Sequence, residues 1–369
     1  MKGRFLCYPI SDLRNFRHTT TMLITALVFV LILSGLVIAH ELGHFWVAKL
    51  AKIRVEQFSI FFPPHIFKKK IGETEYALGS IPLGGYVKLY GEDEQTQGKG
   101  SFASASVATR LTVIIAGVVM NLLLAVTLLT VGFSIGMPPV VSTPSQLGLN
   151  VPTNVIITTV EAGSAANQAG VVTGDTVLGF ESAAALQDFT ASHRGQTVPI
   201  TISHAGVERT VLPHLAISGP AFGVGLAEAT IIKTNPITAL RISVVETGHI
   251  VMAMGRFLKD FVVGLFGHAK IAPEVTGPVG IFVFTGEAIQ LGFTYVIQLA
   301  AMISVNLALV NVIPFPGLDG GRALFVVLEG IFRRKVVHER YEAIAHAVGF
   351  WLLMIFFIAI TVRDIGRFF

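Results

Sequence analysis

Residues 22–44 read MLITALVFVLILSGLVIAHELGH, an apolar run that ends in the pattern His-Glu-x-x-His. Residues 22–39 carry no charge and are long enough to cross most of a bilayer, for which about 20 residues suffice. Histidine and glutamate are costly in or near lipid, so their presence at the end of such a run indicates a functional site. This stretch therefore predicts a membrane helix that carries reactive side chains.

The composition of the whole chain extends this prediction to several membrane helices. Of the 369 residues, 52% are hydrophobic and only 14% are charged, whereas soluble proteins carry about 25% charged residues. Three more apolar runs cover about residues 111–137, 288–313 and 344–362. We therefore expect a polytopic α-helical membrane protein with about four transmembrane helices. Residues 237–266 are apolar but interrupted by charges, which favours a helix lying in the membrane interface.

A polar region between the second and third spans predicts an inserted β-rich domain. Residues 155–160, 177–180 and 198–203 are short β-branched runs, and glycine-rich turns separate them. The expected organisation is an N-terminal extension, a first helical pair with the His-Glu-x-x-His motif, an inserted domain, an interfacial segment and a last helical pair. Their expected bounds are 1–21, 22–137, 138–232, 233–287 and 288–369.

The distribution of Lys and Arg predicts how the chain is oriented. These residues occur nine times between the first two spans and five times between the last two, but only twice in residues 138–232. The positive-inside rule then puts the first and third loops in the cytoplasm and the β-rich domain outside. Four basic residues before Met22 conflict with this orientation, so we expect translation to begin at Met22. We interpret Lys68–Lys70 as an anchor for anionic lipid and expect no nucleic-acid partner.

His40, Glu41 and His44 have the spacing of a zinc hydrolase motif. Positions i and i+4 of a helix share one face, so both histidines can reach one ion. Glu41 lies beside them and can act as general base toward a water that zinc activates. Imidazole and carboxylate ligands suit one Zn²⁺, although the spacing alone leaves another divalent metal open. The single cysteine, Cys7, excludes a multi-cysteine zinc site.

A catalytic zinc normally has a third protein ligand, and the sequence offers two candidates. His65 follows two prolines and precedes a lysine run, where a solvated loop histidine is the simpler interpretation. Asp319 is the better candidate. Pro314 and Pro316 break the third span just before it, and irregular backbone near membrane depth occurs where protein or a water-filled cavity surrounds it. The alternative for Asp319 is a carboxylate that caps the next helix.

These patterns together resemble the site-2 protease family of intramembrane metalloproteases, in the RseP-type branch. The resemblance rests on His40-Glu41-x-x-His44 and on Asn311-x-x-Pro314-x-x-x-Leu318-Asp319-Gly320. It implies that Asp319 is the third zinc ligand and that Asn311, in the motif with Pro314, helps hold the substrate or its oxyanion. Residues 81–88, with Gly84 and Gly85, resemble the family's membrane-entering β-hairpin, which presents an edge strand to the substrate.

The inserted domain resembles a single PDZ domain, on the pattern around Gly163, Gly170 and Gly174-Asp175. The family resemblance implies a zinc-dependent intramembrane endopeptidase of the bacterial inner membrane. Its substrates would be single-span membrane proteins such as anti-sigma factors, or remnant signal peptides, and the PDZ-like domain would bind a peptide or protein tail. Two other functions remain open at this stage, a membrane metal transporter and a catalytically inactive PDZ scaffold.

Overall fold

A computed structural model describes residues 10–92, 98–149, 154–180, 182–204, 206–266, 276–334 and 336–368. Cys7 and the first part of the predicted N-terminal extension lie outside this range. The chain divides into two compact units. Unit 1 comprises residues 1–124, 258–286 and 304–369, and unit 2 comprises residues 125–257 and 287–303. The two units are described separately below.

In the part of the chain that the structure describes, five helices are long and apolar enough to cross a membrane, by length and composition. The candidate spans are Met22–Leu50 within α1 (Ile10–Leu50), α2 (Val107–Ile135), Pro236–Asp260 within α5 (Pro236–Phe266), α7 (Phe293–Val312) and Arg340–Arg367 within α9 (Glu339–Phe368). Four of them correspond to the predicted spans. The fifth, α5, is the helix that the sequence suggested for the interface, and its position there stays a prediction.

The predicted third span is not one continuous helix. A shorter apolar helix, α6 (Pro278–Leu291), ends where α7 begins, and Gly292 separates them. Gly292 has a backbone φ of 119°, a value that residues other than glycine rarely adopt. The apolar pattern runs through this break because the residues on both sides of it are hydrophobic. Hydropathy therefore located the segment but not the interruption.

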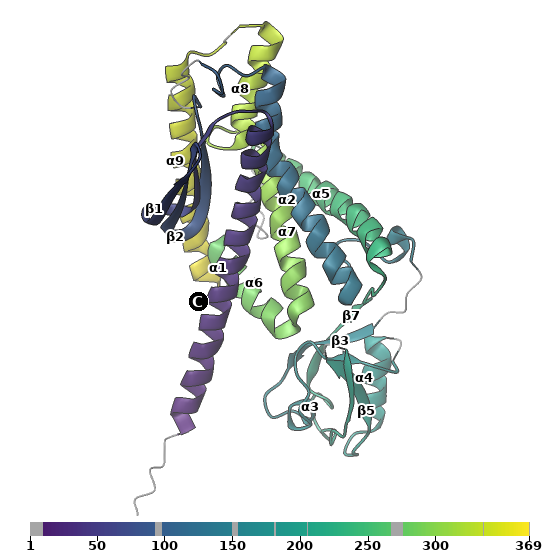
Figure 1. Ribbon diagram of the computed structural model, residues 1–369. Coiled ribbons are helices and arrows are strands. Elements are labelled where there is room, and N and C mark those ends of the chain that lie inside the picture. Colours follow the sequence, from purple (N-terminus) through teal and green to yellow (C-terminus); the bar gives the residue numbers. More distant parts are fainter. Residues whose placement is uncertain are drawn as a thin grey trace, which may run out of the picture. The chain divides into compact units, whose positions relative to one another are not determined.

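Strands β1 (Val55–Ile71) and β2 (Thr74–Leu89) of unit 1 form an antiparallel hairpin beside α1 (Figure 1). The register shows that both strands double back. Residues 55–60 pair on one side with 85–89 and on the other with 75–78, and 75–78 also pairs with 67–70. Residues 85–89 have a strand partner on one side only within the described residues. They therefore form an edge of the sheet, as the sequence predicted for part of this segment.

Polar contacts also connect the remaining helices of unit 1. Arg110, near the start of α2, donates to Glu329 at 2.7 Å on α8 (Asp319–Phe332). Asp364, fully buried in α9, accepts from the backbone N–H of Gly277 at 2.8 Å and of Gly280 at 3.0 Å. A carboxylate at the first turn of α6 compensates for backbone donors that the helix itself leaves unpaired.

Unit 2 contains a five-stranded antiparallel sheet with the strand order β6-β5-β4-β3-β7 (Figure 1). Its elements are η1 (Ser145–Leu147), β3 (Asn154–Val160), α3 (Ala165–Gln168), β4 (Thr176–Val177), α4 (Ala183–Ser192), β5 (Ile200–His204), β6 (Val207–Val211) and β7 (Val224–Ala229). Buried side chains from the sheet and both α-helices, including Ile157, Leu186 and Ile202, form one hydrophobic cluster. The inserted segment therefore has a core of its own.

The entry and exit of this inserted segment lie side by side. Met137 and Ile232 form an isolated antiparallel bridge, with N–H to C=O distances of 3.1 and 3.0 Å. The chain thus leaves the helical part after Met137 and returns to it at Ile232. These two positions adjoin the ends of the segment that the sequence assigned to the inserted domain.

The charged residues of α5 include one that is not at a surface. Glu246 is fully buried, and its carboxylate accepts from the backbone N–H groups of Val140 at 2.6 Å and Val141 at 2.8 Å. His249, one turn further on, lies 2.6 Å from the hydroxyl of Ser142 through its Nδ1. These contacts attach α5 to the segment that follows α2, and they explain a buried charge in a candidate membrane helix.

Candidate metal centre

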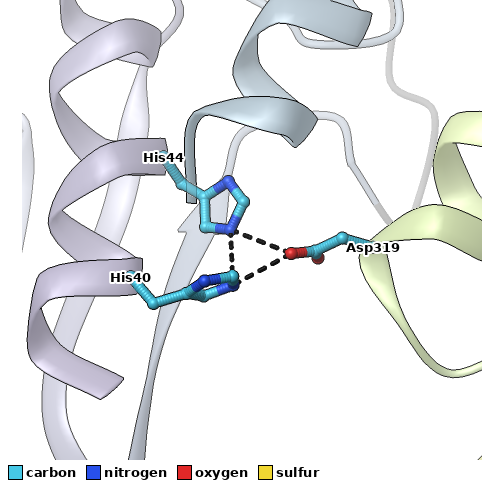
Figure 2. A group of neighbouring side chains, drawn as sticks. All are labelled: His40, His44 and Asp319. Atoms are coloured by element: carbon cyan, nitrogen blue, oxygen red, sulfur yellow. Dashed lines mark hydrogen bonds and ion pairs between the residues drawn. The ribbon is translucent and has the colours of Figure 1, made fainter. Parts of the chain in front are cut away.

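Three side chains from distant parts of the sequence meet in unit 1. His40 and His44 extend from successive turns of α1, and Asp319 extends toward them from the first residue of α8 (Figure 2). His40 Nε2 lies 2.9 Å from Asp319 Oδ2, His44 Nε2 lies 3.3 Å from the same oxygen, and the two Nε2 atoms are 3.2 Å apart. Within the described residues, this is the group that could hold a metal ion.

The contact of the second ring nitrogen, Nδ1, determines the tautomer of His44. Its Nδ1 lies 2.8 Å from the carbonyl oxygen of Val113 on α2. A carbonyl can only accept, so Nδ1 carries the proton and donates it. In the neutral ring, the Nε2 lone pair then faces the carboxylate of Asp319. Two acceptors at this distance repel each other unless a proton or a cation lies between them.

His40 has a comparable arrangement on its other side. Its Nδ1 lies 3.2 Å from the amide nitrogen Nδ2 of Asn121, which is fully buried on α2, and Nδ2 donates in this arrangement. A carboxamide offers a donor and an acceptor in nearly the same shape, so Asn121 can serve either tautomer of the ring. When Nε2 binds a metal, Nδ1 carries the proton, and the Asn121 carbonyl oxygen accepts it after the carboxamide turns by 180°. Partners of this kind orient metal-binding histidines and raise their basicity.

Asp319 is positioned by the irregular backbone that the two prolines predict. Helix α7 ends at Val312, and α8 begins at Asp319. The intervening loop is held by α9, because the Gly317 N–H donates to His346 Nδ1 at 2.9 Å. Burial by itself raises the pKa of the Asp319 carboxyl, but its hydrogen bonds with the two histidines bring that pKa below the ordinary value.

The three ligand atoms lie close enough together to share one zinc ion, at separations slightly shorter than a bound ion would impose. Atoms about 2.0–2.2 Å from a tetrahedral zinc lie roughly 3.3–3.6 Å from each other, and the observed separations are 2.9, 3.2 and 3.3 Å. A single proton can relieve the repulsion between only two of the three ligand atoms, whereas a divalent cation bound among them relieves all three repulsions. Two neutral imidazoles and one carboxylate also form a donor set that catalytic zinc sites use.

A cavity of about 550 Å³ adjoins this group and contains the predicted general base. Glu41, His44 and Asp319 line it, together with residues 86–89 of the sheet edge. Gly85 lies at the start of that edge, where a Cβ would be only 3.6 Å from Cγ of Glu41. The edge strand therefore passes beside the side chain that would move protons.

The other predicted site residues lie around this centre in different ways. Gly84 and Gly85 are buried in β2. Asn311 is half-buried near the end of α7 and Pro314 is exposed after it, and neither is among the described residues that line the cavity. His65, the alternative third ligand, lies in β1 with its ring 3.3 Å from the Tyr86 hydroxyl. The metal-binding group forms without it.

Three groups that complete the centre have no role that the sequence predicts. They are the Val113 carbonyl, the Asn121 amide and the His346 ring. Val113, Gly117 and Asn121 follow one another at intervals of four residues and so share one face of α2, but this spacing does not identify the helix that the face meets. A backbone carbonyl and a histidine on the last helix carry no comparable signal.

Comparison with known proteins agrees with this geometry. The profile of peptidase family M50 matches residues 28–356, which include both halves of the metal-binding group. The chain belongs to this family, the site-2 protease family. Three relatives carry the name "putative zinc metalloprotease". They come from Clostridium acetobutylicum (31% identity, 89% of this chain and 94% of the relative), Clostridium perfringens (33%, 90% and 96%) and Mesorhizobium japonicum (30%, 90% and 96%).

Membership in the family establishes the general nature of this protein. It is a multi-pass membrane protein of a metalloprotease family, and zinc is its cofactor. The group of the described residues that could bind the ion is His40, His44 and Asp319. Membership in this membrane-embedded protease family indicates a lipid environment and membrane proteins as substrates.

Proposed function

We propose that this protein is a zinc-dependent endopeptidase that cleaves single-span membrane proteins within their transmembrane segments. One observation carries the proposal: Glu41, His44, Asp319 and a strand edge that has no second partner among the described residues share one cavity. His40, His44 and Asp319 would hold the ion. When bound, zinc supplies a Lewis acid that activates water and polarises the scissile carbonyl.

Glu41 is the general base in this proposal. It lines the cavity beside His44 and can accept the proton of the attacking water. After the carbon–nitrogen bond breaks, the same carboxyl gives this proton to the leaving amine. The proton taken from water thus ends on the new amino terminus, and the oxygen of that water ends on the new carboxylate.

The strand edge at residues 85–89 would hold the substrate in an extended form. A transmembrane helix satisfies its backbone hydrogen bonds internally, so it must unwind before its carbonyls can be attacked. An edge strand replaces the lost hydrogen bonds by pairing with the unwound segment. The absence of a side chain at Gly84 accommodates the Phe62 ring, and at Gly85 it permits a close approach to the Ser59 carbonyl. We assign Asn311 and Pro314 to substrate binding from the motif that contains them.

The remaining assignments also belong to the proposal. The inserted segment, residues 138–232, would be an extracytoplasmic PDZ-like domain that selects or positions substrates by binding a peptide tail. The excess of Lys and Arg in the first and third loops supports an active site that opens toward the cytoplasm of a bacterial inner membrane. Anti-sigma factors and remnant signal peptides are substrates of the type that this architecture suits.

Cleavage-site mapping tests the proposal. Purified protein in liposomes is incubated with a single-span reporter that carries a tag at each end, and the products are sized by mass spectrometry. We expect a cut within the apolar span, lost with Glu41→Gln and with a zinc chelator. Cleavage confined to the soluble parts of the reporter, or cleavage by Glu41→Gln at the wild-type rate, would refute it.

A further inference from the structure

Helices α1 and α2 are in backbone contact at the metal centre. A Cβ built on Gly43, inside the His-Glu-x-x-His motif, would lie 2.7 Å from the carbonyl carbon of Ala116 and 3.0 Å from Cα of Gly117. Any side chain at position 43 would therefore push the helices apart. Small residues permit this kind of close helix crossing in membranes. The crossing brings the backbone of α2 directly against the two histidines.

Gly117 faces the two ligand nitrogens at this crossing. A Cβ at position 117 would lie 2.8 Å from Nε2 and 2.6 Å from Cε1 of His40, and it would collide with Nε2 of His44. Non-bonded carbon atoms prefer separations of about 3.5–4.0 Å. A methyl group here would press on both atoms that point toward Asp319, so the imidazoles could not both keep their positions.

The residues on either side of Gly117 contact the two histidines: this face of α2 provides one hydrogen-bond partner for each ring. Val113 and Asn121 lie four residues before and after Gly117, and residues four apart share one helix face. The Val113 carbonyl holds His44 at 2.8 Å, and the Asn121 amide holds His40 at 3.2 Å. Gly117 leaves free the space between these two contacts. Each histidine thus has a partner on α2, and the gap between the partners has no side chain.

We propose that Gly117 is a positioning residue of the zinc centre, and that the missing side chain lets His40 and His44 present Nε2 to one ion together. This inference rests on the proposed role of both histidines as ligands. It predicts that the smallest side chain, alanine, disturbs metal binding more than it disturbs the fold. Gly117 touches the ligands and neither binds substrate nor moves a proton.

The test is the zinc affinity of Gly117→Ala, measured by competition with a chromogenic chelator in detergent. We expect affinity about 10–100-fold weaker than that of the wild type, the range found when groups that orient metal ligands are altered. The rise in unfolding temperature on adding zinc should shrink accordingly. Gly35→Ala is the matched control, because Gly35 is also helical and a Cβ there meets nothing within 4 Å. That variant should bind zinc like the wild type.

The effect of Gly117→Ala in a His44→Ala protein distinguishes a clash with histidine from general misfolding. In His44→Ala, one of the rings that meet the new methyl group is absent, so adding Gly117→Ala should lower the metal-free unfolding temperature less than it does in the wild type. Equal lowering in both backgrounds, or wild-type zinc affinity in Gly117→Ala, would overturn the inference. If His44→Ala itself binds zinc normally, the ligand assignment is wrong, which is a different failure.

Discussion

Asn121 provides a prediction whose size follows from the structure. Asn121→Leu removes the amide that contacts His40 Nδ1 and keeps a similar volume in a fully buried position. With zinc bound, the Nδ1 proton of His40 then has no acceptor there. An unsatisfied buried donor costs about 1–3 kcal/mol, and each 1.4 kcal/mol is a factor of about ten in affinity. We therefore expect zinc binding roughly 5–150-fold weaker.

Competition between the purified variant and a chelator of known affinity measures this change. Asn121→Asp is the control, because its carboxylate keeps an acceptor for His40 Nδ1, and it should bind zinc at least as tightly as the wild type. Metal-free unfolding curves show whether either variant alters the fold itself. Zinc affinity of Asn121→Leu within twofold of the wild type would refute the reasoning, because His40 would then need no partner on α2.

Three further predictions concern other parts of the molecule. His346→Leu removes the acceptor for the Gly317 N–H near Asp319 and should weaken zinc binding several-fold. His346→Asn should restore part of the loss. Equal zinc affinities of the wild type and His346→Leu would contradict this prediction. Replacing residues 154–229 by about four Gly and Ser residues should leave zinc affinity unchanged, because the inserted sheet has its own core; loss of zinc in the folded variant would disprove it. Glu246→Ala removes the acceptor for the backbone N–H groups of Val140 and Val141 and should lower the free energy of unfolding by about 1–3 kcal/mol. Glu246→Gln should lower it less, and denaturant unfolding in detergent measures both.

The parts of the site that depend on local sequence could be predicted. His40 and His44 follow from helix periodicity, because their four-residue spacing fixes their common face. Asp319 was the preferred third ligand because two prolines and two glycines indicated irregular backbone near membrane depth. The edge of the sheet was expected within residues 81–88, since the sequence there resembled a known hairpin.

The missing parts depend on how distant segments pack. The roles of Val113, Gly117 and Asn121 appear only when α2 crosses α1, and the sequence contains nothing that fixes the crossing point. The hairpin register was equally hidden, because residues 55–60 pair with two segments and only tertiary packing decides which one becomes the edge. Gly292 interrupts an apolar run whose hydropathy does not change, so the split between α6 and α7 was missed.

The central claim is that one zinc ion on His40, His44 and Asp319 acts together with Glu41. Zinc per chain and reporter cleavage, measured on the same preparations of wild type, Glu41→Gln and Asp319→Ala, test it most directly. We predict one zinc with cleavage in the wild type, one zinc without cleavage in Glu41→Gln, and strongly reduced zinc without cleavage in Asp319→Ala. Full zinc affinity in Asp319→Ala, or cleavage by Glu41→Gln at the wild-type rate, would contradict the claim.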